Sequence, residues 1–72
     1  MTLEEKCVVL VDTVCSRYFS GKIPPDTVAF VGTLLTAFVP DNVDQRVKEL
    51  FAYDLVQAID CLRRQREARW QN

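Results

Sequence analysis

The stretch VDQRVKELFAYDLVQAIDCLRRQREARW, residues 43–70, decides the fold. It contains no proline or glycine, and its apolar residues recur at intervals of three and four, the period of one helix face. Asp41 is a predicted N-cap, and Asp44 lies in the first turn, where a carboxylate meets the positive end of the helix dipole. The stretch therefore predicts one helix, about 42 Å long. The apolar positions of its main stripe are Val43, Val47, Leu50, Phe51, Leu55, Ala58, Cys61 and Leu62.

Upstream of this helix, Gly21 and a pair of prolines mark a break, and the segment before the break also has a helical pattern. Thr2 stands three residues before Glu5, which is the spacing of a capping box. Apolar residues then recur with a 3.6-residue period as far as Tyr18. This pattern predicts a helix over about 3–19, and Gly21 suits the left-handed position after its end.

The segment between the two breaks predicts the second helix, over about 25–39. Pro25 suits a first helical position because the N–H that it lacks is not needed there. With Pro24 as the cap, Ile23 and Val28 are placed as a hydrophobic staple. Small residues occupy the side away from the larger apolar ones: Ala29, Gly32, Thr33, Thr36 and Ala37.

Together these segments predict an all-α fold: a three-helix up-down-up bundle over about 3–19, 25–39 and 43–70. We expect residues 1–72 to form a single small helical domain. The first two helices are each about 25 Å long, so the last three turns of the third helix should overhang them.

Composition argues against catalysis and against bound metal. The chain has no histidine, which removes the commonest metal ligand and the usual acid–base group near neutral pH. Its three cysteines include no C-x-x-C pair, so they fit neither a zinc site nor a disulfide scaffold. We therefore expect a protein with no cofactor, no metal and no enzymatic activity, located in the reducing cytoplasm.

Charge and hydropathy narrow the partners further. Nine basic and ten acidic residues give a formal charge of -1, so no global field attracts polyanions. The longest uncharged stretch, residues 27–40, is shorter than the roughly 20 residues that span a bilayer. No membrane and no small-molecule ligand are indicated.

A second, narrower apolar stripe on the long helix is the main candidate site. It consists of Ala52, Val56 and Ile59, and two alternatives remain open for it. The first two helices cover the stripe as part of the core, or a partner protein covers it. In the second case its end carries residue types enriched at interface hot spots: Arg63, Arg66, Arg69 and Trp70.

The arginine-rich end has a nucleic-acid interpretation and a plainer structural one. Arginines on a projecting helix contact phosphates, and an aromatic side chain such as Trp70 stacks on bases. Cations near a helix C-terminus also complement the dipole, and Asp60 with Arg64 forms an i,i+4 pair. We favour the structural interpretation because four arginines without a wider basic face form a weak electrostatic footprint.

Asp54 is a possible buried polar residue, because it falls inside the apolar stripe of the long helix. A buried carboxylate needs a hydrogen-bonding or charged partner. Three alternatives are a hydroxyl such as that of Tyr18 or Thr36, a basic group of another molecule, and a place at the stripe edge. The edge position is the one we favour.

The sequence thus predicts a non-catalytic protein–protein interaction module, a small adaptor, inhibitor or regulator that acts through its long third helix and forms a homodimer. The alternative is a small transcriptional regulator that binds nucleic acid through the Arg-rich helix end. A third possibility is that the chain is one piece of a larger assembly.

Overall fold

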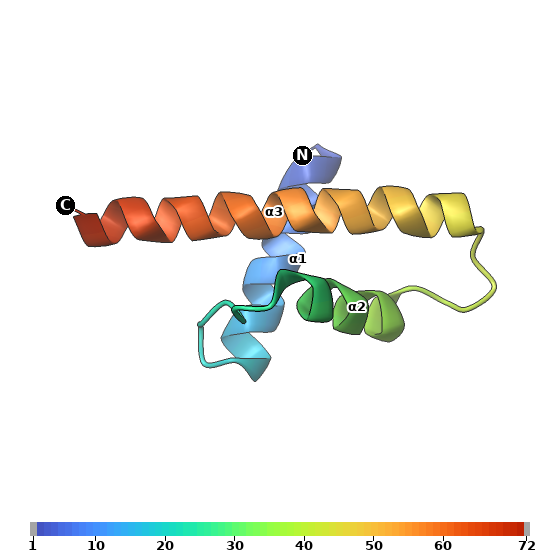
Figure 1. The fold of residues 1–72 in the computed structure, drawn as a ribbon, viewed down its shortest axis with the longest axis horizontal. Coiled ribbons are helices and arrows are strands. Elements are labelled where there is room, and N and C mark those ends of the chain that lie inside the picture. Colours follow the sequence, from blue (N-terminus) through green and yellow to red (C-terminus); the bar gives the residue numbers. More distant parts are fainter. Residues whose placement is uncertain (1, 72) are drawn as a thin grey trace.

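A computed structural model describes the backbone of residues 2–71 and the side chains of residues 2–67. Three helices make up the fold, α1 (Leu3–Tyr18), α2 (Thr27–Phe38) and α3 (Gln45–Gln71), and Figure 1 shows their arrangement. The described part of the chain contains no strand. The prediction of an all-α, three-helix fold with a long third helix is confirmed.

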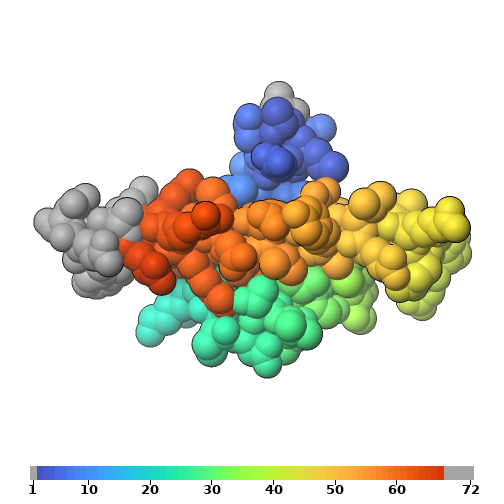
Figure 2. Space-filling model, turned by 45° about the horizontal axis from the view of Figure 1, so that its top comes forward, coloured from blue at the N-terminus to red at the C-terminus, as the bar shows by residue number. Residues whose placement is uncertain are grey.

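The long helix α3 is the element on which both shorter helices pack. In Figure 1, α2 lies along α3 and runs in the opposite direction, whereas α1 crosses α3 steeply near its middle. The molecule is elongated, with extents of 44 × 24 × 19 Å. The C-terminal end of α3 overhangs the other helices over a shorter length than the three predicted turns, because Leu62 is buried and Arg66 contacts Asp12 of α1. Figure 2 shows that the first turns of α3 project as well.

Apolar side chains from all three helices form one core. Leu34, Leu55 and Ile59 are the largest of its fully buried members. On each helix the buried positions lie on one face, so the apolar periodicity predicts most of the inward positions. Tyr18, Val47 and Leu50 are exceptions, because they belong to the predicted stripes and are exposed. The core consists of Cys7, Val11, Val14 and Cys15 of α1, Phe30, Val31 and Leu34 of α2, and Leu55, Ala58, Ile59 and Leu62 of α3.

The start of α1 shows the Thr2 half of the predicted capping box, and Gly21 has the predicted left-handed conformation after the end of the helix. The hydroxyl oxygen of Thr2 accepts a 3.2 Å hydrogen bond from the Glu5 N–H and so satisfies a free donor of the first turn. At the other end, the Gly21 N–H donates to the Cys15 carbonyl at 2.9 Å. Gly21 has a φ of 80° and the preceding Ser20 a φ of 54°, so two left-handed residues reverse the chain.

The starts of α2 and α3 differ from the prediction. Asp26, not Pro24, caps α2, because its carboxylate accepts the Ala29 N–H at 3.0 Å. The helix therefore begins two residues later than predicted, and the expected staple is absent because Val28 is 83% exposed. In the same way Asp44, not Asp41, precedes α3 and accepts the Arg46 N–H at 2.8 Å.

The two glycines should respond oppositely to alanine. Gly21→Ala places a Cβ at positive φ and should lower the free energy of unfolding by about 1 kcal/mol. Gly32→Ala adds a Cβ that meets no atom within 4 Å inside a helix, and should raise it by about 0.5–1 kcal/mol. Urea denaturation followed by circular dichroism measures both values. Equal signs for the two variants would contradict this account of the turn.

Candidate functional site

The second apolar stripe of α3 lies against the core. Ile59 is 0% exposed, and Ala52 and Val56 are partly buried against the core cluster. The expectation that Ile59 faces a partner is therefore corrected, because α1 and α2 approach α3 from two sides and together cover this position. The stripe belongs to the alternative in which the first two helices cover it.

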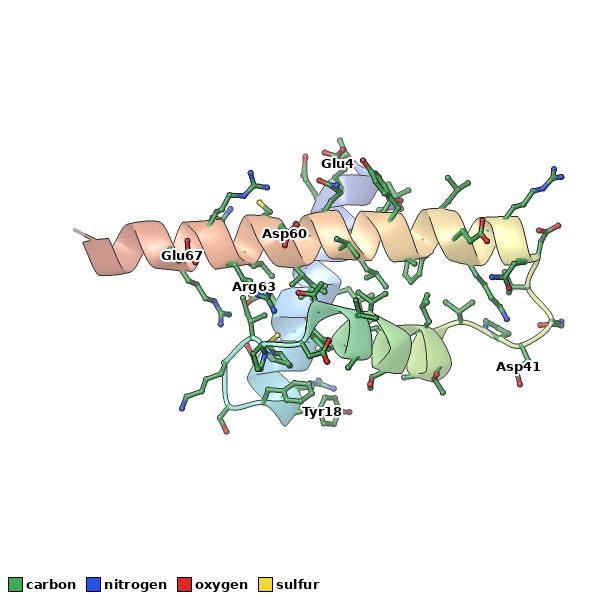
Figure 3. All side chains as sticks on the ribbon, viewed as in Figure 1. Glu4, Tyr18, Asp41, Asp60, Arg63 and Glu67 are labelled. Carbon is green, nitrogen blue, oxygen red and sulfur yellow. The ribbon has the colours of Figure 1, made fainter. Side chains whose placement is uncertain are left out.

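Arg63 and Arg66 turn back onto the chain instead of projecting from it. Arg63 Nη2 donates to the Pro24 carbonyl and, at 3.2 Å, to the Pro25 carbonyl. Figure 3 shows the Arg63 side chain extending from α3 toward the segment that precedes α2. Pro24 and Pro25 lie outside any helix, so their carbonyl oxygens need hydrogen-bond donors from elsewhere in the chain, and the guanidinium group of Arg63 supplies them.

Arg66 contacts the loop between α1 and α2 at a second point, nearer to α1. Its Nη1 donates to the Gly21 carbonyl, and its Nη2 lies 3.4 Å from Asp12 Oδ1. The two arginines thus tie the loop between α1 and α2 to α3. The side chains of Arg69 and Trp70, which the sequence also placed in the candidate site, lie outside the described residues.

Asp54 lies half-buried at the edge of the core, as the edge interpretation expects. It lines a cleft of about 220 Å³ between the start of α1 and α3, opposite Glu4. The cleft also contains Cys61 and Arg64. Two carboxylates, one thiol and one guanidinium form no acid–base or nucleophile–base pair of a known kind. In the described part of the chain no group of three metal-ligating side chains comes together.

The three free thiols differ in their access to solvent. Cys7 and Cys15 are buried and Cys61 is partly exposed. Burial raises the pKa of Cys7, and the negative charge of Asp54 adds to this effect. Burial also raises the pKa of Cys15, which Arg66 lowers in part. Burial thus disfavours the reactive thiolate form of both core thiols in the folded chain.

Three large side chains on the first turns of α3 are open to solvent. Val47 is 53% exposed, Leu50 68% and Tyr53 64%, and their spacing of three places them along one side of the helix. We call this set the α3 ridge. The prediction that Val47 and Leu50 face the core is wrong, because the start of α3 projects past both shorter helices and nothing in the described chain covers it.

A second apolar feature is a groove of about 500 Å³ between the end of α1 and α2. We call it the α1/α2 groove, and sequence reasoning missed it because it placed Tyr18 on the buried face of its helix. Tyr18 is in fact 71% exposed. The consecutive aromatics before the Gly21 break were the available signal. The groove is lined by Val14, Tyr18, Phe19, Thr33, Leu34, Ala37 and Phe38.

Phe19 fixes one wall of the α1/α2 groove. Its ring packs edge-to-face on Phe30, with centroids 5.4 Å apart and planes at 75°. Phe30 is 3% exposed and belongs to the core, so the wall rests on a rigid support. The groove is therefore a preformed feature of the fold.

No protein family, no curated protein and no solved structure matches this chain. Among the described residues, none of the helices combines the length and the apolar character required to cross a bilayer.

Removing the arginine anchor should destabilise the fold. Arg63→Met keeps the aliphatic stem but leaves two loop carbonyls without their charged donor, and should cost about 1–2 kcal/mol of unfolding free energy. Arg64→Met is the matched control, because Arg64 is exposed and donates only to a carbonyl of its own helix. Chemical denaturation compares the two variants. If Arg64→Met lowered the free energy of unfolding as much as Arg63→Met does, the anchoring role of Arg63 would be contradicted.

The thiols should react in a fixed order. At about pH 8, iodoacetamide should label Cys61 in the folded chain and leave Cys7 and Cys15 unlabelled until urea is added. Because the folded pKa of both core thiols lies above the ordinary 9.0, the unfolded chain loses these protons first. Stability should therefore fall as the pH rises above 9.0.

Mass spectrometry of digested protein identifies the labelled positions. The Cys61→Ser variant should take up no label while folded. Labelling of Cys7 or Cys15 at the same rate as Cys61 would show that the core is open.

Proposed function

We propose that this chain is a non-catalytic protein-binding module that presents the α3 ridge to a partner. One observation carries the proposal: three large apolar side chains, each more than half exposed, lie in successive turns of one helix. Apolar groups in contact with water favour association when they form a contiguous patch. The proposed binding element is still the long third helix. Its binding surface is now the α3 ridge, because Ala52, Val56 and Ile59 belong to the core or pack against it.

The surroundings of the α3 ridge have the make-up of an interface. Arg46 and Glu49 are exposed on neighbouring positions of the same turns and supply a polar rim. Tyr53, at the end of the ridge, is of a type enriched among interface hot spots. A ridge of this spacing fits a partner that offers an apolar groove, the arrangement by which one helix docks on another protein.

The nucleic-acid alternative is weaker than it was from sequence. Arg63 and Arg66 donate to carbonyls of their own chain, so phosphate contacts would compete with these hydrogen bonds. Arg64 is exposed but has Asp60 one turn away. We therefore keep protein binding as the proposal. A reducing, cytoplasmic location fits it, because all three thiols are free.

The test replaces one ridge residue with a charge. Leu50→Asp should fold like the wild type, because the Leu50 side chain is already 68% exposed. Leu50→Asp should no longer capture the proteins that the wild-type chain captures from a lysate of its own source, because an unpaired carboxylate at an apolar interface is costly to desolvate. Quantitative mass spectrometry of cross-linked captures measures this loss.

Val9→Asp is the matched control, because Val9 is 52% exposed and lies on α1. This variant should retain the wild-type set of captured proteins. If the wild type and Leu50→Asp captured the same proteins, the α3 ridge would not be the binding surface.

A further inference from the structure

The outward face of α3 carries a second repeat, distinct from the buried stripe. Its members are spaced alternately four and three residues apart, so they follow one line along the helix, as the residues of a coiled-coil seam do. We call them the outward seam, and they are Arg46, Leu50, Tyr53, Gln57 and Asp60, all of them exposed. In Figure 2, α3 crosses the front of the molecule and neither shorter helix lies over it, so a second helix can approach.

The two ends of the outward seam carry opposite charges, and neither has a charged partner among the described side chains. The one ion pair found among them joins Arg66 to Asp12. The Arg64 guanidinium, which the sequence pairs with the Asp60 carboxylate, donates to the Asp60 carbonyl instead. The charged groups of Arg46 and Asp60 are therefore available to a second molecule.

Helix geometry decides how two such seams fit together. In a parallel pair in register, Arg46 would face Arg46 and Asp60 would face Asp60, so like charges would meet. In an antiparallel pair about a two-fold axis between Leu50 and Tyr53, each Leu50 packs on the Tyr53 of the other copy. Arg46 then lies level with Gln57 of the other copy, and three residues, about 4.5 Å along the axis, from the level of its Asp60. The long arginine side chain can bridge this offset.

The outward seam is thus complementary to its own reverse, which favours a second copy as the occupant. A two-fold axis repeats each contact, so the apolar contact and the attraction between opposite charges both occur twice. Gln57 also lines the cleft of about 220 Å³ between α1 and α3. The charged residues of that cleft are Glu4, Asp54 and Arg64, so its net charge is negative and favours the approach of Arg46 from the second copy.

We infer that two copies of this chain pair antiparallel through the outward seams of α3, with Leu50 and Tyr53 at the centre and Arg46 of each copy bound to Asp60 of the other. The inference rests on the proposed function, because it names a second copy as the partner of the α3 ridge.

Charge reversal at the two ends of the seam tests both the occupant and the direction of pairing. The seam is about 21 Å long and makes a small interface, so sedimentation equilibrium is run with up to about 0.5 mM chain. The wild type should then reach twice the 8.3 kDa chain mass. Arg46→Glu and Asp60→Arg should each raise the dissociation constant about 10-fold, because each brings like charges together at two symmetric contacts. The double variant should regain the wild-type dissociation constant, because the opposite charges face each other again.

Glu67→Arg is the matched charge-reversal control. Figure 3 shows Glu67 farther along α3 than Asp60, and both side chains are exposed. In the antiparallel pair, Glu67 lies past the start of the second copy's α3 at Gln45, so this variant should bind like the wild type. Circular dichroism checks that each variant is folded.

A wild type that keeps the mass of one chain at 0.5 mM would overturn the inference. It would also be overturned if the double variant bound no more tightly than the single variants, or if Leu50→Asp dimerised as well as the wild type. A monomeric wild type that still captures other proteins through Leu50 would leave the proposed function in place, so the two failures are distinguishable.

Discussion

Burial of one face of α3 is the constraint on which the rest of the structure depends. Leu55 and Ile59 are 0% exposed because α1 crosses this helix and α2 lies along it. A chain of this size buries only about 60% of the surface that its unfolded form exposes, so it has a single thin core. Each short helix is positioned by its packing on α3. Without the buried face of α3, neither short helix would have a surface to pack on.

The loop between α1 and α2 also depends on α3, through the two arginines that follow the core on that helix. Arg63 and Arg66 continue the inward side of α3 past Leu62, where no apolar neighbour remains, and reach the carbonyls of the segment between α1 and α2. They tie this loop, and Asp12 of α1, to α3. Near the same loop, the edge-to-face contact of Phe19 with Phe30 joins the end of α1 to α2. Two of the four arginines at this helix end, Arg63 and Arg66, thus have partners within the chain.

Two apolar surfaces remain exposed after the three helices have packed together. Where α3 projects beyond its neighbours, its apolar face becomes the α3 ridge, and where α1 and α2 diverge, they leave the α1/α2 groove. Both features follow from joining two short helices to one long one, since the short helices cannot cover it over its full length. The two surfaces lie on different elements of the fold.

The sequence by itself determined the number of helices, the break at Gly21 that follows α1 and most of the inward positions, because periodicity, caps and breakers act over a few residues. Helices α2 and α3 begin two residues later than predicted, because several neighbouring aspartates and prolines could each occupy the N-cap position. Only the tertiary structure decided that Ile59 is buried, that Val47 and Leu50 are exposed and that Arg63 anchors a loop. Local patterns identify an apolar or charged face, but which neighbour covers it depends on the length and crossing of helices far away in the chain.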